Sequence, residues 1–219
     1  LQGLFGQSIL DSLADAPRED GMDSAGALAA VDVDASHFAE RYEEAILQLN
    51  KLTPHQREKL DECLVTEGSF HIQAPAGAGK TFVALHFMLR KLESEPDSRV
   101  LFAAKNLPLA IFVVKWLAQR VKGHRNRAKL LERLHLLFSP VTAGTRVATV
   151  RGGRIELEPV GKLAEYEIIV VDEAHHIWRD EEARSSVESY NAKRRMLLSD
   201  ASQGLHDGFE FPADLTVVE

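Results

Sequence analysis

The feature that most constrains this chain is the octapeptide at residues 74–81, which reads APAGAGKT. Residues 70–73, just before it, are typical of a short strand, and residues 82–89, just after it, have the apolar spacing of a buried helix. A loop of small residues between a strand and a helix can turn its backbone N–H groups toward an anion. Gly77 and Gly79 allow the positive φ that such a loop needs. The pattern therefore predicts a phosphate-binding loop, and a Gly/Ala-rich turn with a chance Lys-Thr is the alternative.

The two side chains that end this octapeptide have the chemistry of a nucleoside triphosphate site. Lys80 is expected to reach the β- and γ-phosphates, and the Thr81 hydroxyl is expected to hold Mg²⁺. The start of the following helix adds a partial positive charge. Ala74 stands where a first glycine is usual, and it is also small. The residues expected to bind the nucleotide here are Pro75, Ala76, Gly77, Ala78, Gly79, Lys80 and Thr81.

A second candidate segment lies at residues 168–173, where an apolar run ends in Asp172 and Glu173. Ligands of open α/β sheets bind at the carboxyl ends of strands. Asp172 is therefore expected to hold Mg²⁺, directly or through water, and Glu173 to polarise an attacking water molecule. A pair that only caps the next helix is the alternative.

Two adjacent histidines, His175 and His176, follow these carboxylates. No cysteine or second histidine cluster at zinc-like spacing accompanies them, so the sequence does not favour a metal site there. We expect His175 to form a hydrogen bond between the hydrolysis site and a neighbouring element. A surface histidine without a special role is the alternative.

Composition limits the setting of the chain. A single cysteine, Cys63, excludes an intramolecular disulfide and is better suited to packing than to chemistry. No apolar run is long enough to span a bilayer, and no secretory signal is visible. We therefore expect an intracellular protein that does not act at a membrane.

The net charge of −7 comes from the beginning of the chain. Residues 1–40 contain eight acidic residues and one arginine, whereas the remaining 179 residues are neutral overall. Because residues 1–35 also lack apolar density, they are expected to form an acidic, disordered leader. The folded domain is expected to span residues 36–219.

Strand and helix patterns alternate through this domain. A helix is expected from Thr53 as N-cap, with Pro54 at its first position and Gln56 three residues after the cap. Another is expected over residues 107–121. Strands are expected over residues 70–73, 99–104, 134–138, 166–171, 196–198 and 215–218, with a hairpin joining 147–150 to 155–157 through Gly152 and Gly153. The alternation predicts an α/β fold with a mainly parallel sheet flanked by helices.

One dense basic run stands out between Lys115 and Arg133, with Glu132 as its single acid. Trp116 lies within it. Such a run can follow a phosphate backbone while the aromatic ring stacks on a base. The alternative is a solvated helix face with Trp116 packed in the core. Both interpretations remain open at this point.

The order of these segments resembles the first motor domain of superfamily 1 helicases and related RecA-like P-loop ATPases. Residues 73–81 resemble motif I and residues 171–175 resemble motif II, although the spelling Asp-Glu-Ala-His is more typical of superfamily 2. Residues 52–56 resemble the glutamine motif, residues 100–109 motif Ia and residues 199–203 motif III. The resemblance covers roughly residues 50–219.

The resemblance implies roles for several further residues. It implies that Gln56 reads adenine, so that ATP is the nucleotide, although Gln56 can also serve as a capping-box residue. It implies that Lys105 and Asn106, together with the basic run, contact single-stranded nucleic acid. It also implies that Gln203 senses the γ-phosphate. The expected activity is ATP hydrolysis, assisted by Lys80, Glu173 and Gln203.

In the family, a second motor domain completes the nucleic-acid track and supplies an arginine finger. No such domain is visible in this sequence, so the chain is expected to be part of a longer protein and to hydrolyse ATP weakly by itself. A nucleotide-dependent regulatory switch without translocation and a nucleotide-binding scaffold fragment are the alternative functions.

Overall fold

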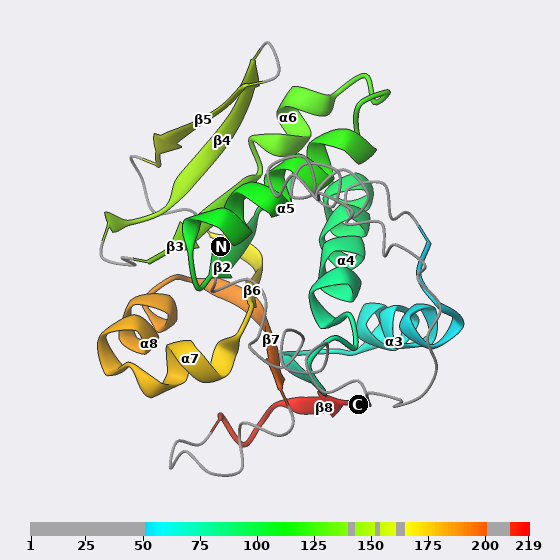
Figure 1. Ribbon diagram of the computed structural model, residues 1–219, viewed down its shortest axis with the longest axis vertical. Helices are drawn as coiled ribbons and strands as arrows, with labels where there is room; N and C mark the ends of the chain where they lie inside the picture. Colours follow the sequence, from blue (N-terminus) through cyan, green and yellow to red (C-terminus); the bar gives the residue numbers. More distant parts are fainter. Residues whose placement is uncertain (1–50, 140–142, 152–153, 161–164, 201–210) are drawn as a thin grey trace, which may run out of the picture. The chain divides into compact units, whose positions relative to one another are not determined.

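The computed structural model describes residues 51–139, 143–151, 154–160, 165–200 and 211–219. Within these ranges eight strands form one sheet in the order β5-β4-β3-β2-β6-β7-β1-β8 (Figure 1). The six neighbouring strands from β3 to β8 in this order pair in parallel, whereas β4 and β5 are antiparallel. The predicted α/β class with a mainly parallel sheet is confirmed.

The strands lie close to their predicted ranges. Their bounds are β1 Phe70–Ala74, β2 Val100–Ala104, β3 Leu134–Phe138, β4 Arg146–Arg151, β5 Arg154–Pro159, β6 Tyr166–Val171, β7 Ala192–Asp200 and β8 Thr216–Val218. The hairpin prediction is also confirmed, because β4 and β5 pair from Arg146 opposite Pro159 to Arg151 opposite Arg154. The β7 strand is longer than expected because polar residues precede its apolar part.

The helices in the described part of the chain include three that the sequence pattern did not reveal. Their bounds are α3 Pro54–Val65, α4 Lys80–Ser94, α5 Leu107–Arg120, α6 Arg127–Leu131, α7 Ala174–Arg179 and α8 Glu181–Glu188. The unpredicted helices are α6, α7 and α8, which have only five, six and eight residues. Such short segments cannot show a clear helical period.

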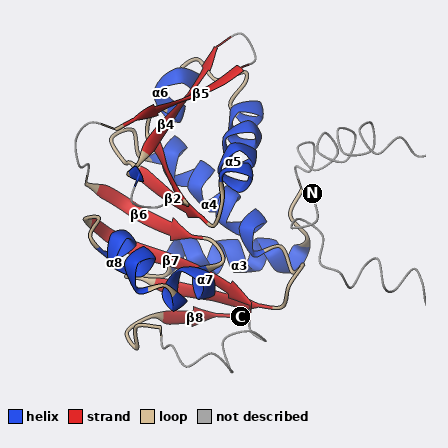
Figure 2. Cartoon of the chain, turned by 60° about the vertical axis from the view of Figure 1, so that its left-hand side comes forward, coloured by secondary structure: helices blue, strands red, loops and turns tan. Residues whose placement is uncertain are grey.

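Helices cover both faces of the sheet, as Figure 2 shows. Alternation along the strands explains this, because successive side chains point to opposite faces. In β2, Val100, Phe102 and Ala104 pack with the face covered by α3 to α6. Leu101 and Ala103 pack instead with α7 and α8. Strands with both faces buried are nearly continuous in apolar residues, which is how the sequence revealed them.

The start of α3 matches its predicted capping box. The Thr53 side chain accepts a hydrogen bond from the Gln56 N–H at 3.2 Å, and the Gln56 side chain accepts one from the Thr53 N–H at 3.1 Å. Pro54 occupies the first turn. Cys63 is fully buried on the same helix, so its expected packing role is confirmed.

The parallel arrangement brings four strand ends together. The carboxyl ends of β1, β2, β6 and β7 lie at the same edge, since neighbouring strands run in the same direction. The predicted loop follows β1, Lys105 follows β2, and Asp172 follows β6. No helix in the described part of the chain is long and apolar enough to cross a membrane. The predicted leader, residues 1–35, and the domain start at residue 36 lie outside the described residues.

Candidate nucleotide-binding site

The loop between β1 and α4 has the backbone conformation that its glycines predicted. Gly77 has φ of 78° and Gly79 has φ of 90°. Gly79 is also the N-cap of α4, and the Ala78 N–H donates to the Pro75 carbonyl at 3.2 Å. A residue with a side chain would be strained at both glycines. The loop is therefore built by glycine in the two places where φ must be positive.

Lys80 folds back over this loop. Its ammonium donates to the Ala74 carbonyl at 2.7 Å and to the Pro75 carbonyl at 3.0 Å. These carbonyls hold the cation over the turn, within the segment where phosphates are expected. Lys80 thus stabilises the loop in this structure and is half-buried.

Thr81 and Asp172 meet although 91 residues separate them in the sequence. The Thr81 hydroxyl donates to Asp172 Oδ2 at 2.8 Å. Asp172 is 3% exposed, and its Oδ1 accepts the Glu173 N–H at 2.9 Å. Burial raises the pKa of the Asp172 carboxyl to about 6, while the bond from Thr81 opposes this shift.

These two groups fit a Mg²⁺ ion. A hydroxyl and a carboxylate are oxygen ligands, which Mg²⁺ prefers. A buried carboxylate whose pKa is raised also gains most from a nearby cation, because the cation favours its charged form. The predicted metal ligands, Thr81 and Asp172, are therefore brought together with suitable chemistry.

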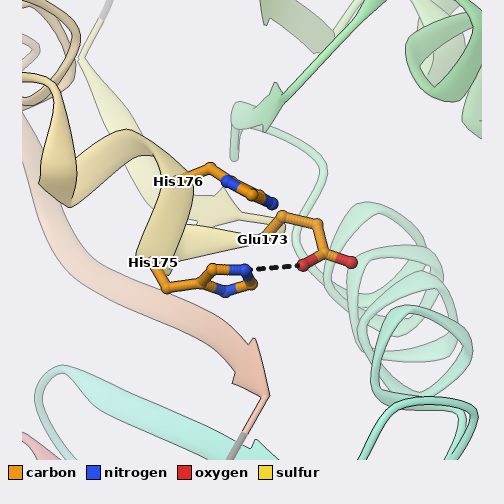
Figure 3. Close-up of side chains that lie close together, drawn as sticks. All are labelled: Glu173, His175 and His176. Carbon is orange, nitrogen blue, oxygen red and sulfur yellow. Dashed lines mark ion pairs between the residues drawn. The ribbon is translucent and has the colours of Figure 1, made fainter. Parts of the chain in front are cut away.

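Glu173 forms a sharp corner between β6 and α7. Its φ of 51° makes it the one residue other than glycine with positive φ in the described part of the chain. Such a conformation is uncommon for a residue with a long side chain and is often found at functional sites. Its side chain is 46% exposed and its Oε2 lies 3.4 Å from His175 Nε2 (Figure 3). The carboxylate therefore faces both solvent and a buried imidazole.

The two histidines differ in their surroundings. His175 is fully buried, whereas His176 is half-buried and its Nε2 lies 3.1 Å from Lys105 Nζ. Burial lowers the pKa of both rings, although Glu173 opposes the shift. The alternative of His175 as a surface histidine is wrong. Its expected hydrogen bond to a neighbouring element is absent among the described residues, where neither ring nitrogen has a hydrogen-bond partner and Nε2 has only the ion-pair contact with Glu173.

Gln56 joins α3 to the loop. Its Nε2 donates to the Ala78 carbonyl at 3.1 Å, while its Oε1 completes the capping box with Thr53. Both ends of the amide are thus in use. The interpretation of Gln56 as a capping residue is confirmed, and its contact with adenine stays a prediction.

The two residues after β2 lie at the same edge of the sheet. Both Lys105 and Asn106 are exposed. Asn106 is the N-cap of α5, where its side chain accepts the Leu109 N–H at 3.0 Å. Lys105 is the cation that contacts His176. A contact of either residue with nucleic acid stays a prediction.

Trp116 does not serve the basic run as a stacking platform. It is fully buried, edge-on to Phe82 and His86, with the Arg120 guanidinium 3.9 Å from its ring centroid. The interpretation of Trp116 as a base-stacking residue is wrong, because α5 turns this side toward α4. The basic residues around Trp116 in the sequence do not indicate which way its ring points.

Arg133 also has a structural role within the run. Its guanidinium donates to the carbonyls of Leu92, Glu95 and Ser98. These carbonyls belong to the end of α4 and the turn that follows. The exposed cations that remain in the run are Lys122, Arg125 and Lys129. A nucleic-acid track here would therefore depend on fewer charges than the sequence suggested.

Two buried polar pairs were not predicted. His71 Nε2 lies 2.7 Å from Ser199 Oγ, between β1 and β7, and His135 Nδ1 lies 2.8 Å from the Tyr166 hydroxyl. A histidine within an apolar strand is the one sequence signal that could have revealed them. Gln203, the predicted γ-phosphate sensor, lies outside the described residues.

Comparisons with known proteins give a family match. Residues 49–199 match the family described as type III restriction enzyme, res subunit. No curated protein matches the chain.

Two solved structures are similar over 68% of this chain. A Sulfolobus solfataricus SWI2/SNF2 ATPase core in complex with dsDNA is 18% identical, with a TM-score of 0.47. The ATP-dependent type ISP restriction-modification enzyme LlaBIII bound to DNA is 13% identical, with a TM-score of 0.41. The match covers 32% of the first of these chains and 13% of the second.

The expected resemblance to helicase-like P-loop ATPases is confirmed, and the family match favours superfamily 2, of which the Asp-Glu-Ala-His spelling is typical. Because the match covers more than half of the sequence, the chain belongs to the family of the type III restriction enzyme res subunit, with a helicase-like P-loop ATPase domain.

Proposed function

We propose that this chain binds Mg²⁺–ATP at the loop between β1 and α4 and hydrolyses it. The contact between Thr81 and Asp172 at 2.8 Å is the observation that carries the proposal. It joins the two predicted metal ligands across 91 residues of sequence, beside two glycines in the conformation of a phosphate loop. If residues 172 and 173 only capped the next helix, or if residues 74–81 were a chance turn, the Thr81 and Asp172 side chains would have no reason to meet.

Lys80 binds the phosphates in the proposed complex. Its ammonium exchanges the Ala74 and Pro75 carbonyls for β- and γ-phosphate oxygens, which carry more negative charge. The N–H groups of the loop and the start of α4 face the same anion. Mg²⁺ held by Thr81 and Asp172 supplies further neutralisation of the phosphate charge.

Glu173 is the proposed general base. Its partly exposed carboxylate, one residue after Asp172, can accept a proton from a water molecule beside the γ-phosphate. The left-handed backbone at Glu173 directs this side chain separately from that of Asp172. The adjacent carboxylates therefore have different tasks, one with the metal and one with water.

Coupling to nucleic acid is part of the proposal. Lys105 is exposed at the end of β2 and contacts His176 on α7, only a few residues after Asp172 and Glu173. A phosphate backbone that attracts Lys105 would release this contact with α7. Because a second motor domain completes the nucleic-acid track in the family, the coupling is tested in a chain that carries both domains, by measuring phosphate release with and without a single-stranded oligonucleotide. No change would favour the regulatory switch over the helicase-like motor.

The nucleotide site is tested by Lys80→Ala. Loss of the ammonium should weaken binding of a fluorescent ATP analogue at least about tenfold, because charged hydrogen bonds to phosphate contribute about 1.5–3 kcal/mol. Lys122→Ala, which removes an exposed cation far along the chain, should bind like the parent chain. Equal affinity of all three proteins would exclude this loop as the phosphate site.

The proposed base is tested by Glu173→Gln. This change should preserve ATP binding and slow single-turnover hydrolysis by at least about 10²-fold, the usual scale of general-base catalysis. Glu67→Gln, at an exposed position, serves as the control. Hydrolysis at the parent rate in the Glu173 variant would assign water activation to another residue.

A further inference from the structure

Three side chains near the corner between β6 and α7 form a cluster with metal-binding chemistry. They are Glu173, His175 and His176, and one ligand atom from each lies within 4.8 Å of the others. Figure 3 shows the Glu173 carboxylate and the His175 ring facing each other, with the His176 ring alongside. The sequence did not favour such a site, because no cysteine or second histidine cluster at zinc-like spacing accompanies the two histidines.

The backbone explains why near neighbours in sequence converge. Glu173 has φ of 51°, and the His176 N–H donates to the Glu173 carbonyl at 2.8 Å. This closes the first turn of α7, so that the side chains at positions 173 and 176 project to the same side. The two imidazole rings lie 4.2 Å apart between centroids.

His175 provides a second, independent indication of a ligand. The residue is fully buried, and in the described part of the chain neither of its ring nitrogens has a hydrogen-bond partner. Its Nε2 is directed at Glu173 Oε2 at 3.4 Å, which is longer than a good hydrogen bond. Buried polar groups without a partner are rare and call for an explanation. A cation between Nε2 and the carboxylate would satisfy both groups.

The ligand set selects the class of cation. Two imidazole nitrogens and one carboxylate oxygen suit Zn²⁺ and its neighbours in the transition series, whereas Mg²⁺ prefers oxygen ligands alone. Bonds of about 2.0–2.1 Å place tetrahedral ligands about 3.4 Å apart. The three ligand atoms, which now lie within 4.8 Å of one another, must therefore move closer together. The partly exposed Glu173 side chain can rotate to allow this.

Lys105 competes for this cluster. Its ammonium lies 3.1 Å from His176 Nε2, and this positive charge opposes a second cation beside the same ring. Lys105 is exposed, so its side chain can move into solvent. Metal binding at the cluster should thus oppose the contact between Lys105 and α7.

We propose that Glu173, His175 and His176 bind a divalent cation of the Zn²⁺ class, and that the bound cation withholds the Glu173 carboxylate from water. The claim that the cation withholds this carboxylate rests on the proposed function, in which Glu173 is the general base. A metal-loaded chain would still bind Mg²⁺–ATP, because Thr81 and Asp172 are not among the three ligands, but it would not hydrolyse the nucleotide.

The experiment measures metal binding directly, on the 219-residue chain without a histidine tag. Co²⁺ is added to apo protein, its visible absorption reports the ligands, and Zn²⁺ affinity follows from competition with a chromophoric chelator. We expect one Zn²⁺ per chain and loss of the Co²⁺ spectrum with an excess of Zn²⁺. His176→Ala and Glu173→Gln should each weaken Zn²⁺ binding at least about tenfold, since even the groups that support metal ligands contribute on this scale.

Two further variants make the result specific. His55→Ala changes an exposed histidine on α3 and should bind Zn²⁺ like the parent. Lys105→Ala removes the competitor and should strengthen Zn²⁺ binding. Unchanged affinity in the Glu173 and His176 variants would overturn the site, as would weaker binding in the Lys105 variant.

The effect on nucleotide separates this proposal from the proposed function. Saturating Zn²⁺ should leave the affinity for the fluorescent ATP analogue with Mg²⁺ unchanged and should stop single-turnover hydrolysis. If Zn²⁺ binds at the three ligands but hydrolysis continues, the claim that the cation withholds the Glu173 carboxylate from water is wrong. If the analogue fails to bind without Zn²⁺, the proposed function fails while the metal-binding result still stands.

Discussion

The contact between Gln56 and the loop can be tested by adding one methyl group. A Cβ placed on Gly79 would lie 2.2 Å from Gln56 Nε2 and 3.3 Å from Gln56 Cδ, so the amide would have to move. The Gln56 side chain is flexible, and it can leave at the cost of its hydrogen bonds to Ala78 and Thr53. Gly79→Ala therefore disrupts an interaction made by another residue.

The structure gives the magnitudes. Holding alanine at φ of 90° costs about 1–2 kcal/mol. The two partly exposed hydrogen bonds of Gln56 contribute about 0.5 kcal/mol each, the low end of the usual range. Gly79→Ala should thus lower the free energy of unfolding by about 2–3 kcal/mol in the parent chain, but by only about 1–2 kcal/mol in a Gln56→Ala background.

Urea unfolding of the four proteins in this double-mutant cycle measures the difference. The expected coupling free energy is about 1 kcal/mol, above the error of about 0.3–0.5 kcal/mol within which independent sites add. If Gly79→Ala destabilises both backgrounds equally, Gln56 does not occupy the space beside Gly79, and the proposed link between α3 and the loop is wrong.

Two further outcomes concern buried titratable groups. Burial lowers the pKa of His71 from 6.5 to about 4, so the folded state favours the neutral ring. The contribution of this shift to the free energy of unfolding should be fully present above pH 6.5 and should fall by about 2–3 kcal/mol on acidification to pH 4.5. Urea midpoints at both pH values check this, and His71→Gln should reduce the difference by the share that belongs to His71, because His86, His135, His175 and His176 also have lowered pKa values. Burial raises the pKa of Cys63 to about 12, so iodoacetamide at pH 8 should leave the native chain unmodified and alkylate it in urea, as mass spectrometry would show.

The sequence predicted the elements whose residues carry a strong local signal. Buried parallel strands such as β2 and β6 are continuous in apolar residues, and the loop after β1 is recognisable from its glycines and Lys80. The short helices α6, α7 and α8 are too brief for a periodic pattern. The order of the strands in the sheet could not be predicted from local sequence patterns either, because strand pairing depends on contacts between distant segments.

The candidate site likewise combines residue types that the sequence predicted with contacts that only the fold reveals. The types of residue at positions 80, 81, 172 and 173 pointed to phosphate and metal chemistry. The meeting of Thr81 with Asp172 depends on the fold, since both follow strands that are not direct neighbours. Trp116 was ambiguous because a basic neighbourhood does not show which way a ring points. The left-handed backbone at Glu173 has no sequence signal, since that conformation is rare for glutamate.

The three carbonyls held by Arg133 affect how this domain can be cut and rejoined. The turn at residues 95–99 joins α4 to β2 and includes exposed residues, which would normally recommend it as a site for a protease nick, an insertion or new chain ends. Yet the guanidinium binds the carbonyls of Leu92, Glu95 and Ser98, so opening the turn also releases the segment before β3. Lysine could not replace it, because a single ammonium lacks the planar fork of arginine. In this domain, surface exposure is a poor guide to a permissive loop.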